Sequence, residues 1–118
     1  MKIDIDALKK EPTTIIDERH DWGYQIRLVN TEWYCGRLLV LTNGVHGSYH
    51  QHPIKDEAFV VLKGEVFVKC QDSGGLYKLG EVVRMGAGVP HEMWAKTIPA
   101  VILEVSTHDD NMDYEEVI

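Results

Sequence analysis

The chain has 118 residues and a formal net charge of −7 at pH 7. We expect one domain spanning residues 1–118, because this length suits a single hydrophobic core. The acidic balance argues against nucleic acid as a partner, since phosphate binding needs a basic face. The apolar runs, such as 37–42 and 100–105, are shorter than the ~18 residues of a membrane span. Since the first residues also lack an apolar signal region, we expect a cytoplasmic protein that does not bind membranes.

Short segments with strand character, separated by Gly, Pro and Asn turns, follow one another along most of the chain. The pattern predicts an all-β domain. The predicted strands are 24–29, 37–42, 57–62, 64–70, 76–79, 81–84, 91–95 and 100–105, with a further N-terminal strand at 3–8. We expect 64–70 and 76–79 to form a hairpin whose turn is 73–75. The only predicted helix, at 6–10, is too short to exceed a turn or two.

Five residues in the middle of the chain have the spacing G-x5-H-x-H-x4-E-x6-G. They are Gly44, His50, His52, Glu57 and Gly64. Alternate residues of a strand point to one face, so His50 and His52 are expected to form a chelating pair. Pro53 cannot continue a central strand, and the resulting bend lets Glu57 turn to the same face at the start of the next strand. The spacing therefore predicts a metal site built on strands.

A second element follows with the spacing G-x5-G-x-G-x2-H, formed by Gly80, Gly86, Gly88 and His91. Together the two elements resemble the two motifs of the cupin superfamily. The first matches at every fixed position, whereas the second has Gly86 where family members usually have Pro. The resemblance covers residues 36–106, with N-terminal strands in 1–35 and an acidic tail at 107–118. It implies a jelly-roll barrel, the double-stranded β-helix.

The resemblance also implies a ligand set for one metal ion inside the barrel, namely His50, His52, Glu57 and His91. Such a set suits a borderline divalent ion such as Mn, Fe, Co, Ni or Zn. An octahedral ion would leave two positions for water or substrate, and a saturated tetrahedral ion would be structural. The sequence leaves both alternatives open.

Three further residues are candidates for catalysis. Glu104 stands among aliphatic residues, and strand alternation leaves open whether it faces the barrel interior as a base or lies on the exterior of the sheet. His46 and Tyr49 precede the ligand strand closely enough to contact a substrate. The ordinary alternative for His46 is a surface histidine.

The segment 101–116 resembles the closing strand and tail of cupins related to mannose-6-phosphate isomerases and of cupins associated with nucleotide-sugar metabolism. This implies a small-molecule ligand such as a sugar, and a metal-dependent sugar or sugar-phosphate isomerase or epimerase. Two alternatives remain: a metal-dependent dioxygenase or decarboxylase, and a non-catalytic metal- or sugar-binding module.

Two expectations concern the ends of the chain. The acidic tail is either a solvated terminal segment or a lid or arm. We also expect a homodimer, because an open barrel leaves strand edges to cover and the segments 3–8 and 24–29 are available for this. Trp22, Trp33 and Tyr34 would then lie near the interface.

Overall fold

The computed structural model describes residues 15–71 and 73–117, which form β-strands and contain no helix. The strands are β1 (Ile15–His20), β2 (Gly23–Asn30), β3 (Cys35–Leu41), β4 (His50–Gln51), β5 (Glu57–Lys63), β6 (Val66–Cys70), β7 (Ser73–Tyr77), β8 (Val82–Met85), β9 (His91–Ala95), β10 (Ala100–Ser106) and β11 (Glu115–Glu116). The described residues accordingly include no helix that could span a membrane.

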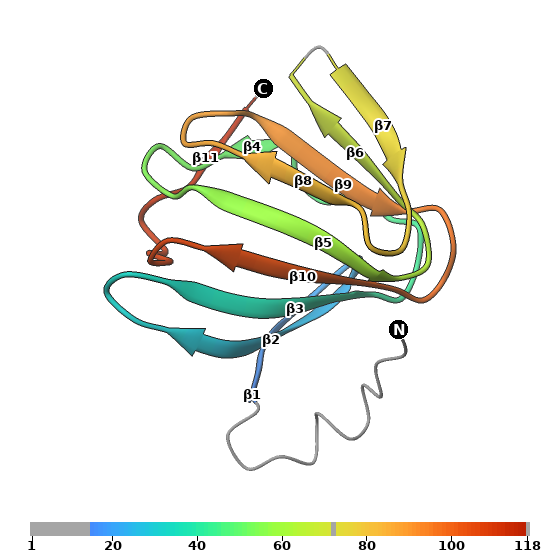
Figure 1. The fold of residues 1–118 in the computed structure, drawn as a ribbon, viewed down its shortest axis with the longest axis horizontal. Coiled ribbons are helices and arrows are strands. Elements are labelled where there is room, and N and C mark those ends of the chain that lie inside the picture. Colours follow the sequence, from blue (N-terminus) through green and yellow to red (C-terminus); the bar gives the residue numbers. More distant parts are fainter. Residues whose placement is uncertain (1–14, 72, 118) are drawn as a thin grey trace.

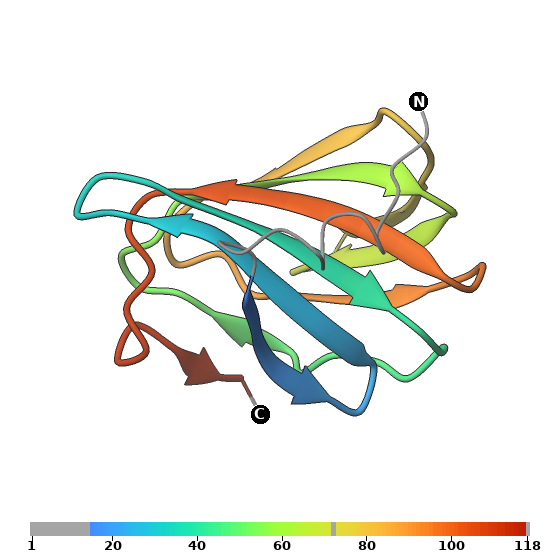
Figure 2. The ribbon, with the colours of Figure 1, turned by 90° about the horizontal axis from the view of Figure 1, so that it is seen from below.

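The strands form two antiparallel sheets that face each other (Figures 1 and 2). The six-stranded sheet has the order β1-β2-β3-β10-β5-β8, and the five-stranded sheet has the order β11-β4-β9-β6-β7. In Figure 1, β10 lies between β3 and β5, although it follows them by many residues in the chain. The predicted all-β class is confirmed.

The main hydrophobic core fills the space between the two sheets. Its buried members are Leu39, Leu41, Phe59, Val61, Val66, Val68, Met85, Ala95, Ala100 and Ile102. They come from alternate positions of facing strands, as expected when one face of each sheet is buried. Because Glu57 precedes Phe59 and Val61 at the same alternation in β5, it enters the barrel with them.

A second cluster lies on the other face of the six-stranded sheet. Its buried members are Tyr24, Ile26, Leu38, Val40, Leu62 and Val101. Both faces of β3 are therefore covered, and every residue of this strand is buried. A charged residue of β3 must consequently find a partner inside the protein.

The hairpin between β6 and β7 differs from the prediction. The predicted turn at 73–75 is instead the start of β7, with Ser73 opposite Cys70 and Gly75 opposite Val68. The chain reverses earlier, where Gln71 has a φ of 53°. Gln71 thus has the left-handed conformation typical of turns, and Ser73 and the two glycines after it pair with β6 instead of forming the turn.

The N-terminal part of the sheet also differs. The predicted strand 24–29 lies within β2, but β2 is paired on one side with β1 and on the other with β3, so it has no free edge. The predicted strand at 3–8 and the helical turn at 6–10 lie outside the described residues. Trp33 and Tyr34 are exposed, with relative accessibilities of 74% and 55%. The homodimer stays a prediction.

Most described residues of the acidic tail, 107–117, are exposed, but the segment also forms an arm that pairs with the barrel. Its strand β11 lies beside β4 (Figure 2). In this pairing Glu116 is opposite His50. Asp113 in the same arm is buried. The arm thus adds an edge strand next to the strand that carries the first histidine of the motif.

Candidate metal centre

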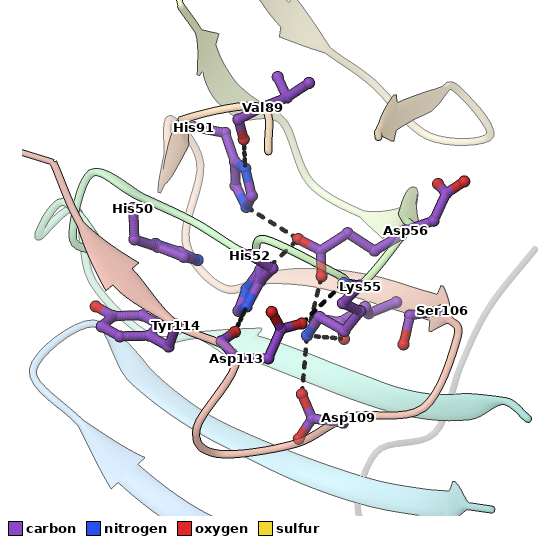
Figure 3. A network of polar contacts seen from close by, with 12 residues as sticks. His50, His52, Lys55, Asp56, Val89, His91, Ser106, Asp109, Asp113 and Tyr114 are labelled. Atoms are coloured by element: carbon purple, nitrogen blue, oxygen red, sulfur yellow. Dashed lines mark hydrogen bonds and ion pairs between the residues drawn. The ribbon is translucent and has the colours of Figure 1, made fainter. Parts of the chain in front are cut away.

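Three histidines meet inside the barrel. His50 begins β4 and lies directly opposite His91, the first residue of β9, while His52 follows β4 by one residue. One ring nitrogen from each lies within 4.8 Å of the others. Figure 3 shows the three rings around a common space. The predicted meeting of the two motifs is therefore present in the fold.

The Nδ1 atom of each of the three imidazoles lies within hydrogen-bonding distance of a main-chain carbonyl oxygen. The pairs are His50 with Ser48 at 2.9 Å, His52 with Asp113 at 2.6 Å, and His91 with Val89 at 2.9 Å. A carbonyl oxygen only accepts hydrogen bonds, so each Nδ1 must carry the proton and donate it. The Nε2 atom of each neutral ring then keeps its lone pair. This arrangement is typical of metal-binding histidines, whose second nitrogen fixes the tautomer.

Glu57 places a carboxylate beside two of these histidines. Its Oε1 atom is 2.9 Å from Nε2 of His91 and 3.9 Å from Nε2 of His52. The 2.9 Å contact lacks hydrogen-bond geometry, and both Glu57 oxygens and His91 Nε2 are buried without a hydrogen-bond partner. Buried polar atoms of this kind are costly unless paired. Oε2 of Glu57 lies 3.1 Å from Lys55 Nζ, whereas Oε1 and the Nε2 atom of His91 face each other. A cation shared by Oε1 and the imidazole lone pairs would satisfy these atoms, so these residues fit a metal ion.

The ionisation states suit ligation as well. Burial lowers the pKa of His50 to about 4 and also lowers the pKa of His52. Burial alone would raise the pKa of Glu57, but His91, Lys55 and His52 together lower it to about 2. At neutral pH His50 and His52 are neutral and Glu57 is ionised, which are the forms that bind metals.

The three histidines and Glu57 lie in the wall of a cavity of about 750 Å³. This volume is in the range of small-molecule sites, roughly 300–1,000 Å³. The apolar part of the wall includes Phe59 and Met93, and the indole ring of Trp22 forms another part of it. A metal ion held here would therefore face a space large enough for a small ligand.

Glu104 lines this cavity, which decides the direction that strand alternation left open. In the register of β10 it lies opposite Arg37 on β3, and its Oε2 atom is 3.3 Å from Arg37 Nε and 3.4 Å from Lys55 Nζ. Burial, together with the charge of Glu57, raises the pKa of Glu104 against the opposing effect of the two cations. The carboxylate is thus interior and paired.

The interior charge network has one more carboxylate, Asp109 in the arm. It lies 2.9 Å from Lys55, a contact seen in Figure 3. It also lies 2.5 Å from Arg37 and 3.6 Å from Arg27. Sequence reasoning did not assign Asp109 to the site. The sequence does indicate that Arg37 needs a partner, because it is a cation at the start of an apolar strand. Nothing in the sequence identifies Asp109 as that partner.

The other two catalytic candidates lie apart from these charges. His46 is in the cavity wall, but its ring stacks on Trp94 at 3.8 Å and its side chain is 54% exposed. Tyr49 is not part of the wall, and its ring instead lies 5.0 Å from Lys69 Nζ. The neighbours of Tyr49, Ser48 and His50, do line the cavity, as strand alternation requires.

The arm supports the ligand residues directly. The carboxylate of Asp113 accepts hydrogen bonds from the main-chain N–H groups of Ile54 and Lys55, both at 2.8 Å. The ring of Tyr114 stacks on His50 with centroids 4.9 Å apart, and its hydroxyl is 2.6 Å from Ser48 Oγ. The alternative interpretation of the tail as a cover over the site agrees with these contacts.

Comparison with protein-family models and with curated proteins gives no match. Several solved structures share the fold. An uncharacterised protein with a double-stranded β-helix domain from Klebsiella pneumoniae aligns with a TM-score of 0.72 and 14% identity, over 99% of this chain and 96% of that one. The cupin domain of Cnp3 from Schizosaccharomyces pombe aligns with a TM-score of 0.66 and 12% identity, over 73% and 64%.

The capsular polysaccharide assembling protein CapF from Staphylococcus aureus aligns with a TM-score of 0.75 and 18% identity. The match covers 94% of this chain but 34% of CapF, so only one part of CapF corresponds to it. These similarities show that the chain has the cupin fold, the double-stranded β-helix, and they confirm the fold predicted from the two motifs.

Proposed function

We propose that this chain binds one divalent metal ion with His50, His52, Glu57 and His91, and that it acts as a sugar or sugar-phosphate isomerase or epimerase. The observation that carries the proposal is the meeting of three imidazoles, fixed in the tautomer that leaves Nε2 free, with a buried carboxylate that lacks a hydrogen-bond partner. The site opens to a cavity that suits a small molecule.

Three imidazoles and one carboxylate favour a borderline ion such as Mn, Fe, Co, Ni or Zn over Mg or Ca, which prefer oxygen ligands. When bound, the ion would polarise a carbonyl or hydroxyl oxygen of the substrate. Lys55 supports the ligand set, because its Nζ atom is 3.1 Å from Glu57 Oε2. This contact holds one carboxylate oxygen and leaves Oε1 directed to the histidines.

Isomerisation also needs a group that moves a proton, and the four ligands are already committed. Glu104 is our first candidate, because it is an interior carboxylate in the cavity wall whose pKa is raised by burial. His46 is the second candidate, since it lies at an exposed part of the same wall. The similarity to CapF, whose name refers to polysaccharide assembly, supports a carbohydrate as the ligand.

The experiment that tests this function measures proton exchange. Metal-loaded protein is incubated in D₂O with a panel of sugars and sugar phosphates, and deuterium at C1 and C2 is followed by NMR. We expect metal-dependent exchange with at least one sugar, and loss of exchange in Glu57→Gln. Metal binding with sugar binding but no exchange would instead identify a binding module, and turnover that requires oxygen would identify an oxygenase.

A further inference from the structure

The charges in the cavity wall are unequal in number. Among the described residues, three Lys or Arg side chains line the cavity, and six carboxylates do so. The cations are Arg27, Arg37 and Lys55, and the carboxylates are Asp21, Glu57, Glu104, Asp109, Asp110 and Glu116. A bound divalent ion would still leave an excess of one negative charge. An anionic ligand would therefore enter a space that is already negative.

Each of the three cations already has a carboxylate partner. Asp109 contacts all of them, at 2.5 Å from Arg37, 2.9 Å from Lys55 and 3.6 Å from Arg27. Lys55 has a second partner in Glu57 at 3.1 Å. Arg37 and Lys55 are buried, whereas the side chain of Arg27 is 39% exposed. A phosphate group could therefore pair with the two buried cations only by displacing the half-buried carboxylate of Asp109, which would then lose its own partners.

The remaining carboxylates of the wall favour a ligand that donates hydrogen bonds. Asp21, Asp110 and Glu116 are exposed residues that line the cavity and contribute carboxylate oxygens. An ionised carboxylate only accepts hydrogen bonds, so its complement is an N–H or O–H group. Several hydroxyl groups on one small molecule supply such donors without adding charge.

An aromatic surface completes the wall. The rings of His20 and Trp22 stack with centroids 4.6 Å apart and planes 8° apart, and both residues line the cavity. The face of an aromatic ring is its negative side and attracts weakly positive C–H groups. A sugar ring offers such C–H groups on one face and hydroxyl groups around its edge.

We infer that the ligand of this cavity is an uncharged polyhydroxylated molecule, a free monosaccharide or polyol, and that Asp109 excludes phosphorylated sugars by occupying the cations of the wall. The inference rests on the proposed function, from which it takes a sugar as the ligand. It narrows the proposed ligands from sugars and sugar phosphates to unphosphorylated sugars and polyols.

Matched pairs of ligands test the inference. Calorimetry with metal-loaded wild-type protein compares glucose, mannose, fructose and xylose, each with its monophosphate. We expect at least one free sugar to bind, and each phosphate to bind about tenfold more weakly than its parent or not at all, because like charges oppose entry. Tighter binding of any phosphate than of its parent, or no binding across the free sugars, would overturn the inference.

Two variants distinguish a specific effect of Asp109 from the effect of the total negative charge of the cavity wall. Asp109→Asn removes the carboxylate shared by the three cations, whereas Asp110→Asn removes an adjacent charge from the same wall. We expect inorganic phosphate and the sugar monophosphates to gain affinity in Asp109→Asn and not in Asp110→Asn. Equal behaviour of the two folded, metal-loaded variants would show that Asp109 does not exclude anions.

Metal content is measured on each preparation, which separates this inference from the proposed function. Protein that does not retain metal contradicts the proposed metal site, whatever ligand binds. Protein that retains metal and prefers a sugar phosphate leaves the metal site and the isomerase proposal standing and contradicts only the inference about charge.

Discussion

His52 and Asp113 are 61 residues apart in the chain, yet the Nδ1 atom of His52 lies 2.6 Å from the main-chain carbonyl oxygen of Asp113. Through its carboxylate, the same residue binds the amides of Ile54 and Lys55. The C-terminal arm thus fixes both the orientation of one ligand and the bend that leads to the next ligand, Glu57. A sequence motif that ends at His91 does not contain all the residues that shape the site.

The first prediction concerns Asp113. Replacing it with Ala leaves the amides of Ile54 and Lys55 without their buried acceptor, which should cost about 1–3 kcal/mol of unfolding free energy. The carboxylate of Asp113 also fixes the segment whose main-chain carbonyl oxygen binds His52. Without this carboxylate His52 is held less firmly, so metal affinity should fall about 10–100-fold. Chemical denaturation and metal titration measure the two effects. Glu115→Ala, an exposed change in the same arm, is the control and should leave metal affinity unchanged.

The second prediction is the pH dependence of the metal-free protein. His50 has a pKa of about 4 in the folded chain, below the ordinary value of 6.5, because it is buried. The unfolded chain therefore takes up a proton as the pH falls through 6.5, and the folded chain does so only near 4. This contribution to stability is complete above pH 6.5 and is lost as the pH falls toward 4.

The loss amounts to about 1.4 kcal/mol per pH unit for one such histidine, and His52 adds to it because its pKa is also lowered. Urea denaturation between pH 7 and pH 4.5 measures the slope. His50→Gln removes one titrating group and should give a shallower slope. Identical slopes in this variant and the wild type would show that His50 does not titrate as described.

The third prediction concerns Glu104. Changing it to Gln keeps the shape of the side chain and removes the proposed base, so turnover on a sugar that supports exchange should fall about 100-fold. Bound metal should stay at the wild-type level, because Glu104 is not a ligand. Normal turnover with normal metal content would exclude Glu104 and direct attention to His46, and an equal loss of metal would indicate a structural role.

The fourth prediction uses two glycines with similar backbone conformations. Gly64 has a φ of 76°, and a Cβ atom there would lie 2.7 Å from Thr97 Oγ1 and 3.0 Å from the carbonyl oxygen of Pro99. Gly80 has a φ of 84°, but a Cβ atom there would meet no atom within 4 Å. Both changes to Ala carry a conformational cost of about 1 kcal/mol. Gly64→Ala should cost about 1–3 kcal/mol more because of the steric clash.

Differential scanning calorimetry of the two variants checks this prediction. Gly64→Ala should melt several degrees below Gly80→Ala. Equal melting temperatures would mean that the segment around Thr97 and Pro99 moves away without cost.

The sequence predicted the strands near the metal centre well because alternation and the spacing of His50, His52 and Glu57 depend on local geometry. Local geometry could not give the direction of Glu104, since alternation alone does not say which face of a strand is interior. The pairing of β10 with β3 decides this by placing Arg37 opposite Glu104. That register is a long-range property and has no local signal.

The acidic tail is a second case in which local sequence does not predict the contacts of a residue. Its acidic composition is typical of a solvated segment. Asp113 is nevertheless buried and accepts hydrogen bonds from the main chain, and Asp109 is half-buried in contact with Arg37 and Lys55. Composition reports the average preference of such residues, whereas the fold supplies specific partners that reverse it. Asp109 and Asp113 therefore became visible only in the structure.

The central claim is that His50, His52, Glu57 and His91 hold one divalent ion, and elemental analysis of protein purified without a histidine tag tests it most directly. The wild type should contain about one ion per chain, and His52→Ala should retain almost none, because the loss of one ligand leaves an incomplete site. His108→Ala, which alters a histidine outside the cluster, should retain the wild-type content. Equal metal content in His52→Ala and the wild type would contradict the assignment.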